Sequence, residues 1–259
     1  MKISHITGKC LLLTFLTAVV FWLPTSASAG PQHLKVVPNK LDINESFQGA
    51  EVKISTDAPP GSSVVVELRG DAHEDRLLRK GRRGGLWMNV GEVVVRNAPS
   101  LYLVMSTDPR LLSNPDGEGR WGYQALDKQL EFSGAIPKAG KDKLFQEFLK
   151  LKESEGLYGA FPGALKVVAT SPDHASVEGQ FSLSDKIPPA NYRIHCFVLN
   201  DGKVVDQKTT AFPVEMQGMP AILAALAYDH ATVYGLVAII IAILAGLITG
   251  LIFKGKGAH

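Results

Sequence analysis

A run of basic residues is the feature of this sequence whose spacing most directly suggests chemistry. Five cations fall within eight positions and lead into an aromatic stretch with Trp87; they are Arg76, Arg79, Lys80, Arg82 and Arg83. Such groups bind phosphate, carboxylate or sulfate oxygens, so the candidate ligands are lipid headgroups, an oxyanion or an acidic partner surface. The alternative is a solvated hairpin edge whose charges block strand addition, with Trp87 in the core.

Catalytic patterns are not found in the sequence. It has no Gly-x-Ser-x-Gly elbow, no Ser-x-x-Lys, no His-Glu-x-x-His, no phosphate-binding glycine loop and no Cys-x-x-Cys. The densest group of potential metal ligands, Asp71–Asp75, is expected to be a solvated loop. We therefore predict a protein that is not an enzyme, with no catalytic residues, no cofactor and no metal. An enzyme of an unrecognised type is the second alternative.

Charge is distributed unevenly along the 259 residues. The formal net charge is +2, but Lys2, Lys9, Lys254 and Lys256 lie in terminal segments that have no acidic residue. Without these four lysines, 23 basic residues face 25 acidic ones. A nucleic-acid-binding body is normally basic, so this class of partner is excluded. The hydrophobic content of 46% is enough for a buried core.

The N-terminus has the pattern of an export signal. Lys2 and Lys9 precede an apolar run from Leu11 to Trp22, and small residues end the segment at Ala29. A 12-residue helix spans only about 18 Å, short of a hydrocarbon core of about 30 Å. We predict that residues 1–29 are a cleaved signal peptide.

The C-terminus has the pattern of a membrane span. Val233–Phe253 is free of charge, and its 21 residues make a helix of about 31 Å. Lys254 and Lys256 follow directly, which predicts a cytoplasmic tail at 254–259 and a periplasmic body. The expected location is the bacterial inner membrane, crossed once.

Small residues recur at every fourth position of this span. They are Ala238, Ala242, Gly246 and Gly250, which form a ridge along one helix face. Such ridges let transmembrane helices pack closely, so we predict contact with a membrane protein partner or with a second copy. The alternative is that small residues are simply common in membrane helices.

The body between the two ends has the alternation of half-buried β-strands. Glu51–Thr56, Ser63–Arg69 and Leu101–Thr107 each place every second residue on an apolar face. Ser63–Arg69, for example, is expected to point Val64 inward and Glu67 outward. Gly140–Gly156 instead has helical spacing and predicts one amphipathic helix.

The predicted fold class is mainly β, with one or two immunoglobulin-like antiparallel sandwich lobes, the amphipathic helix and the C-terminal transmembrane helix. A similar order of glycine, strand, aspartate, double proline and strand surrounds Pro59-Pro60 and Pro188-Pro189, which favours two duplicated lobes. A single larger sandwich is the alternative. The predicted segments after the signal are a first lobe at 30–112, a linker loop and helix at 113–160, a completing lobe at 161–215, a juxtamembrane segment at 216–232 and the span at 233–253.

Several short stretches resemble a family of single-pass transmembrane proteins first collected from alphaproteobacteria. The stretches are Phe47–Ala50, Gly85–Val90, Pro99–Tyr102, Ile187–Tyr192, Asn200–Val204 and Tyr234–Leu236. The resemblance implies an export signal, a β-rich exported body and a C-terminal anchor, and it implies no catalytic residues. It also suggests a sulfite-exporter-type permease as a partner. Ala190 departs from the family pattern, in which glycine is more usual.

Together these observations predict a non-enzymatic, membrane-anchored periplasmic protein. Its expected role is an interaction or accessory subunit of a membrane transport system. The alternative is an anion or small-ligand binding module that uses the Arg76–Arg83 segment.

Overall fold

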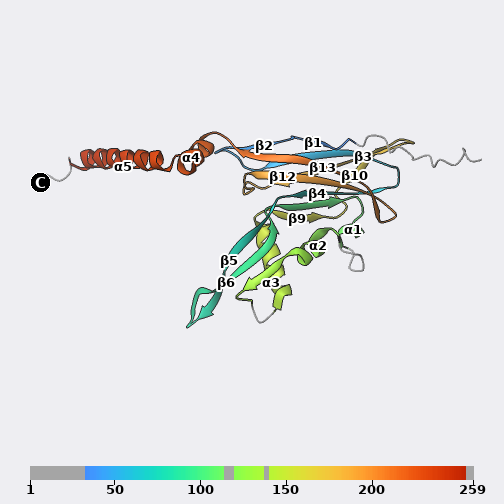
Figure 1. Cartoon of the computed structure of the whole chain (residues 1–259), viewed down its shortest axis with the longest axis horizontal. Coiled ribbons are helices and arrows are strands. Elements are labelled where there is room, and N and C mark those ends of the chain that lie inside the picture. Colours follow the sequence, from blue (N-terminus) through green and yellow to red (C-terminus); the bar gives the residue numbers. More distant parts are fainter. Residues whose placement is uncertain (1–32, 114–119, 137–139, 255–259) are drawn as a thin grey trace, which may run out of the picture. The chain divides into compact units, whose positions relative to one another are not determined.

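The computed structural model describes residues 33–113, 120–136 and 140–254 (Figure 1). The predicted signal peptide and part of the predicted linker loop, residues 114–119, lie outside these ranges. The predicted cytoplasmic tail lies outside them beyond residue 254.

Two sheets form the body. The first has the strand order β1-β3-β11-β10 and the second has the order β2-β13-β12-β4-β7-β9. The first sheet consists of β1 Lys35–Val37, β3 Ala50–Ala58, β11 Ala175–Leu183 and β10 Lys166–Thr170. The second consists of β2 Leu41–Ile43, β13 Lys203–Met216, β12 Ala190–Asn200, β4 Ser63–Arg69, β7 Tyr102–Ser106 and β9 Tyr158–Phe161.

This strand order is that of a variable-type immunoglobulin sandwich, which confirms the predicted fold class. The Tyr192 hydroxyl, near the start of β12, donates a hydrogen bond of 2.6 Å to the Pro188 carbonyl. A tyrosine at this corner is a hallmark of such sandwiches, in which an inter-sheet disulfide cysteine normally follows two residues later. Ile194 occupies that position here and is fully buried, so apolar packing replaces the disulfide.

The core lies between the two sheets. Alternate residues of β3 and β11 point into it, among them Val52, Ile54 and Phe181, and Phe212 of β13 is fully buried as well. The period-two pattern of Glu51–Thr56 predicted the inward positions of Val52 and Ile54. A tight turn at Asp201 and Gly202, where both φ angles are positive, joins β12 to β13.

Both faces of β4 and β7 are buried, which corrects the predicted alternation. Val65 is fully buried and Glu67 is 7% exposed, although both were expected to point to solvent. The reason is a layer of inserted elements that covers the outer face of the second sheet. Trp121 of this layer contacts Phe197 of β12 with ring centroids 5.5 Å apart.

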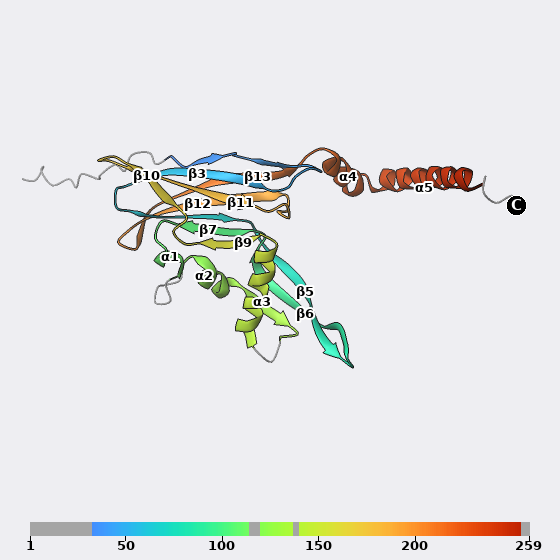
Figure 2. The ribbon, with the colours of Figure 1, turned by 180° about the vertical axis from the view of Figure 1, so that it is seen from behind.

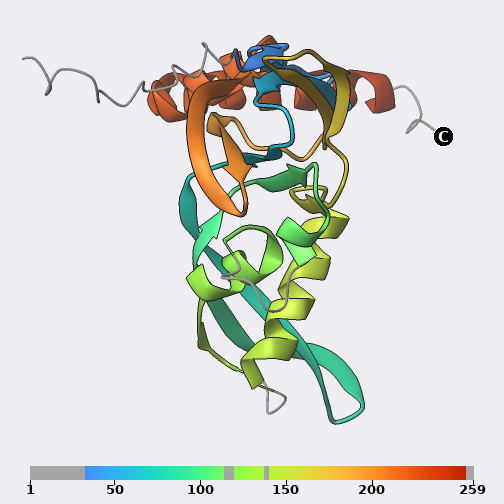
Figure 3. The same ribbon diagram turned by 90° about the vertical axis from the view of Figure 1, so that its right-hand side faces the viewer.

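The inserted layer comes from the long connections on either side of β7. The first connection forms a hairpin of β5 Ala72–Arg83 and β6 Leu86–Pro99. The second contains α1 Arg110–Ser113, α2 Gly122–Gln129, β8 Glu131–Gly134 and α3 Gly140–Ser154. β8 pairs with β6, so the insertions share a three-stranded sheet. Figures 2 and 3 show this layer on one side of the sandwich.

The structure contains one sandwich in its described residues, so the prediction of duplicated lobes is wrong. β3 pairs with β11 along nine residues, and β4 pairs with β12. Strands of the two expected lobes therefore pair with one another within the same sheets. The repeated double prolines have a structural cause, because each pair lies where the chain crosses from the first sheet to the second.

Two helices follow the sandwich. α4 covers Met219–Tyr228, has no buried residue and is joined to β13 by Gln217-Gly218. α5 covers Ala231–Lys254, of which Ala231–Phe253 is long and apolar enough to cross a membrane. The predicted span is thus one continuous helix that begins two residues earlier than expected. The predicted amphipathic helix is α3, although Leu151 of its expected apolar face is exposed.

Candidate interaction site

The basic run forms the far end of the β5–β6 hairpin. Gly84 and Gly85 connect the strands with φ angles of 58° and 86°, a region that glycine adopts without strain. Two positive φ angles define a type I′ turn, whose twist matches that of the flanking strands. The pairing places Arg82 opposite Trp87 and Arg83 opposite Leu86.

The base of this hairpin is fixed to the inserted layer. β8 pairs with β6 at Val93–Arg96, and the Lys152 ammonium of α3 lies 2.8 Å from the Asp75 carboxylate of β5. Arg79 donates a hydrogen bond of 3.1 Å to the Ala135 carbonyl. Within the described residues, Lys80–Val90 pairs only with itself. This segment contains the last four residues of β5 and the first five of β6, and it extends for about 17 Å. Figure 1 shows the β5–β6 hairpin projecting from the body.

The predicted cations have two different roles. Arg76 lies 2.9 Å from Glu74, which Arg96 also contacts at 3.1 Å. The hydrogen bonds from Arg96 and Arg76 hold the pKa of Glu74 below its usual range. Arg76 therefore contacts a residue of the hairpin itself, and Arg79 attaches the hairpin to the residue after β8. Lys80, Arg82 and Arg83 have no carboxylate within ion-pair distance among the described residues, and Arg82 donates only to the Gly85 carbonyl at 3.3 Å.

Large apolar side chains are exposed beside the three cations at the tip. Trp87 is 73% exposed, Leu86 68% and Met88 45%, and Leu78 on β5 is exposed as well. The expectation that Trp87 belongs to the core is wrong, because the projecting strands have solvent on both faces. We call Lys80–Val90 with Leu78 the hairpin tip. Exposed aromatic and aliphatic side chains beside arginines are typical of protein interaction surfaces, so the hairpin tip is a candidate site.

The hairpin leaves the sandwich at the same end from which the chain continues to α5. β4 and β13 are both antiparallel to β12, so they run in the same direction. Arg69 and Ala211 both pair with Arg193 and lie at the same level of the sheet. The chain continues from β4 into the hairpin, and from β13 into α4. Both connections therefore begin at the same end of the sandwich.

The predicted ridge lies on α5 with its spacing of four residues intact. Ala238, Ala242, Gly246 and Gly250 are exposed. A Cβ atom added at Gly246 or Gly250 would meet no atom of the described chain within 4 Å. The ridge is therefore open to another helix.

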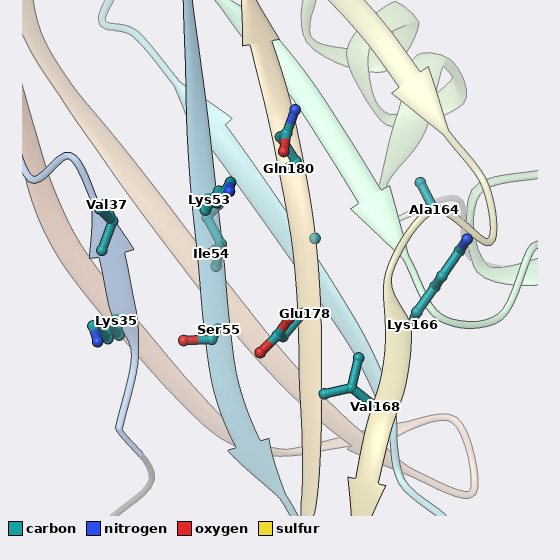
Figure 4. Close-up of a pocket in the computed structure, with 11 residues that line it drawn as sticks. Lys35, Val37, Lys53, Ile54, Ser55, Ala164, Lys166, Val168, Glu178 and Gln180 are labelled. Atoms are coloured by element: carbon teal, nitrogen blue, oxygen red, sulfur yellow. The ribbon is translucent and has the colours of Figure 1, made fainter.

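A shallow depression of about 580 Å³ lies on the outer face of the first sheet (Figure 4). Lys35, Lys53 and Lys166 line it together with Glu178, and they come from four neighbouring strands. None of these lysines forms an ion pair with Glu178. The lining is a solvated strand face, and it provides no enclosed site.

A second depression contains functional candidates that the sequence interpretation missed. It is a groove on the outer face of the second sheet, lined by Arg69, Arg193, His195 and Trp121 among others. The available signal was the outward position of Arg69 and Arg193 on two predicted strands. Their proximity depends on the pairing of β4 with β12, which the sequence does not show.

Cys196 has the environment of a buried apolar residue. It is 2% exposed, and its Sγ lies 4.0 Å from Thr56 Oγ1. Burial raises the pKa of its thiol to about 11, so it is not a ready nucleophile. Among the described residues, no group of three histidine, cysteine or acidic side chains could hold a metal ion.

The fold and the apolar α5 define a class, that of β-sandwich proteins with a C-terminal membrane-spanning helix. The chain belongs to the family described as "Putative transmembrane protein (Alph_Pro_TM)", whose model matches residues 33–255. This match confirms the resemblance inferred from the sequence. The description of the family as transmembrane and the length and apolar composition of α5 both fit membrane anchoring. No curated protein matches the chain.

Two solved structures are similar over most of the chain. Murine CRIg shares 12% identity, with 73% of this chain and 100% of that chain covered and a TM-score of 0.24. Domain 1 of VCBP3 from Branchiostoma floridae shares 10% identity, with 72% and 96% covered and a TM-score of 0.24. These scores are too low to support any argument about function.

Proposed function

We propose that this protein is a membrane-anchored interaction protein whose hairpin tip contacts an acidic surface of a polytopic membrane protein. The observation that supports this proposal most strongly is the composition of the tip. Trp87, Leu86 and Met88 are exposed beside three cations that have no carboxylate partner in the described residues. Tryptophan, methionine and arginine are enriched at protein interfaces, and buried aromatic anchors supply much of the binding energy.

The location of the tip favours a partner in the same membrane. The hairpin begins at the end of the sandwich from which the chain continues through α4 to α5. α4 adds only about 15 Å of helix between the sandwich and α5. The 12 residues of β5 extend for about 40 Å. The hairpin is therefore long enough to reach the extramembrane surface of a protein beside the anchor.

In this proposal the body lies in the periplasm and α5 crosses the bacterial inner membrane once. The support is the sequence pattern, in which Lys254 and Lys256 follow the span and an export-signal pattern precedes the body. The protein works by binding and not by catalysis. Its role is that of an accessory subunit of a transport system, and the partner to test first is a sulfite-exporter-type permease.

The ridge on α5 favours a second contact within the membrane. Small side chains let helix backbones approach closely, and nothing in the described chain covers Gly246 or Gly250. The ridge would pack against a helix of the same partner or against a second copy.

Site-specific photocrosslinking in native membranes tests the proposal. A photoreactive amino acid replaces Trp87 in the full chain, and a matched variant carries it at Val205. Val205 is 57% exposed and lies near the start of β13, at the opposite end of the sandwich from the hairpin. We expect a discrete adduct with a membrane protein from position 87 and none from position 205.

Adducts with lipid alone would favour the alternative, in which the cations bind anionic headgroups. Equal adducts from both positions, or none from position 87, would contradict the proposal. Charge reversal of Arg82 and Arg83 should reduce the protein adduct without changing the amount of protein in the membrane.

A further inference from the structure

α4 is an apolar helix that the described body leaves uncovered. Its ten residues, Met219–Tyr228, include no charged side chain, and none of them is buried. A stretch of about 10–14 apolar residues is typically a buried core helix, a signal segment or a helix at a membrane surface. Because α4 is exposed and follows the sandwich in the chain, the first two descriptions do not fit it.

The large apolar side chains of α4 share one face of the helix. At about 100° per residue they fall within an arc of about 100°. They are Met219, Ile222, Leu223 and Leu226. Met219, Ile222 and Leu223 are 56%, 60% and 49% exposed, and Ala221 and Ala224 lie on the opposite face. An exposed face of large apolar side chains marks contact with a membrane or with another protein.

The position of α4 in the chain favours the membrane. α5 begins after only Asp229 and His230, and the chain from Tyr228 to Ala231 can reach at most about 11 Å. The 23 residues of Ala231–Phe253 make about 35 Å of helix, which already exceeds a hydrocarbon core of about 30 Å. α5 is therefore long enough to cross without α4, and the end of α4 lies within reach of the headgroup layer.

The side chains at the junction of α4 and α5 suit a headgroup layer. Asp229 and His230 separate the two apolar helices with polar groups, and both are exposed. Tyr228 is 87% exposed and Tyr234 is 44% exposed. Tyrosine has an apolar ring and a polar hydroxyl, and it is enriched at the level of the headgroups. The two tyrosines flank the polar pair, so this junction has the composition of a membrane boundary.

We infer that α4 lies in the membrane surface, with its face of large apolar side chains in contact with lipid acyl chains. The lipid bilayer is the partner because the span, α5, continues directly from α4. Only Gln217 and Gly218 separate β13 from α4, so the adjoining end of the sandwich is held near the bilayer. The inference rests on α5 as the span, and it does not depend on what the hairpin tip contacts.

Electron paramagnetic resonance of spin-labelled cysteines in the full chain tests the inference, in nanodiscs of phosphatidylcholine and phosphatidylglycerol. Single cysteines replace Ile222 or Leu223 on the apolar face, Ala221 or Ala224 on the opposite face, Ile241 in the span, or Val205 in the body as the control. Cys10→Ser leaves Cys196 as the native thiol, and its exposure of 2% protects it from the label. Collisions of each label with oxygen, which concentrates in lipid, are compared with its collisions with a nickel chelate, which stays in water.

We expect the ratio of oxygen to nickel collisions to be low, high, high and low along positions 221 to 224. The two high values should exceed the ratio at position 205 several-fold. Nickel access at position 222 equal to that at position 205 would overturn the inference. Low access to both reagents at position 222 would show that protein covers this face, and a ratio that rises steadily from 221 to 224 would show that α4 extends the span. Either result would also overturn it.

The label at Ile241 separates this inference from membrane anchoring itself. Oxygen should reach position 241 and nickel should not, because this residue lies in the middle of α5. If position 241 is in lipid and position 222 is not, the surface helix is refuted while the anchor stands. If nickel reaches position 241 freely, α5 is not the span, and the inference fails together with the anchor.

Discussion

The ion pair between Lys152 and Asp75 connects α3 to the base of the hairpin, and its loss should have a measurable cost. The two side chains are 10% and 18% exposed, and Lys152 Nζ lies 2.8 Å from Asp75 Oδ2. At an effective dielectric constant of about 20, unit charges at this distance attract by about 6 kcal/mol. Much of that attraction is offset by the desolvation of both groups.

Removal of one partner leaves the other charge buried, which typically costs about 3–5 kcal/mol. Asp75 retains a second contact, with His73 at 2.9 Å, and both members keep some exposure to water. We therefore expect Lys152→Met to lower the free energy of unfolding by about 2–3 kcal/mol. The double variant with Asp75→Asn should recover part of this loss, because position 75 then carries no buried charge that lacks the Lys152 ammonium.

The assay is denaturant unfolding of the full chain in detergent, followed by tryptophan fluorescence, which reports the exposure of the buried Trp121. The matched control is Lys150→Met, which changes an exposed lysine of the same helix and should alter stability by less than about 0.5 kcal/mol. The reasoning is refuted if Lys152→Met is no more destabilising than this control. It is also refuted if the double variant is less stable than Lys152→Met by the full cost of a second independent change.

Three further predictions concern the sandwich. Tyr192→Phe removes the hydrogen bond to Pro188 and should lower the unfolding free energy by about 1–2 kcal/mol, measured by denaturant unfolding. Cys196 should react with a thiol reagent at neutral pH only after unfolding, because burial raises its pKa to about 11; mass spectrometry would detect labelling of the folded chain. His195 should titrate below its ordinary pKa of 6.5 by NMR, and Arg193→Gln should raise that pKa. Because the unfolded chain binds this proton more readily, the contribution of His195 to stability is present above about pH 6.5 and lost as pH falls through the folded pKa.

Local sequence patterns predicted the strands that have one solvated face. β3 is such a strand, and its inward residues Val52 and Ile54 were identified from their alternation. The same rule failed for Val65 and Glu67 of β4, because inserted elements cover the second face of that strand. Whether a second layer exists depends on contacts between segments far apart in the chain, and alternation within one strand does not reveal it.

The candidate sites show a similar division. The density of cations from Arg76 to Arg83 was visible in the sequence, but the exposure of Trp87 follows from how far the hairpin projects beyond β8. The groove was not predictable, because Arg69 and Arg193 are 124 positions apart in the sequence and only strand pairing brings them together. The repeated double prolines do not mark two lobes, since each pair lies at a crossing from the first sheet to the second within one sandwich.

The central claim is that the body lies outside the cytosol and is anchored by one C-terminal span. Labelling of introduced cysteines in intact spheroplasts with a membrane-impermeant maleimide tests it most directly. Val205→Cys, on the exposed face of β13, should be labelled in intact spheroplasts, and His259→Cys only after the membrane is opened. Labelling of Val205→Cys only after the membrane is opened would contradict the account.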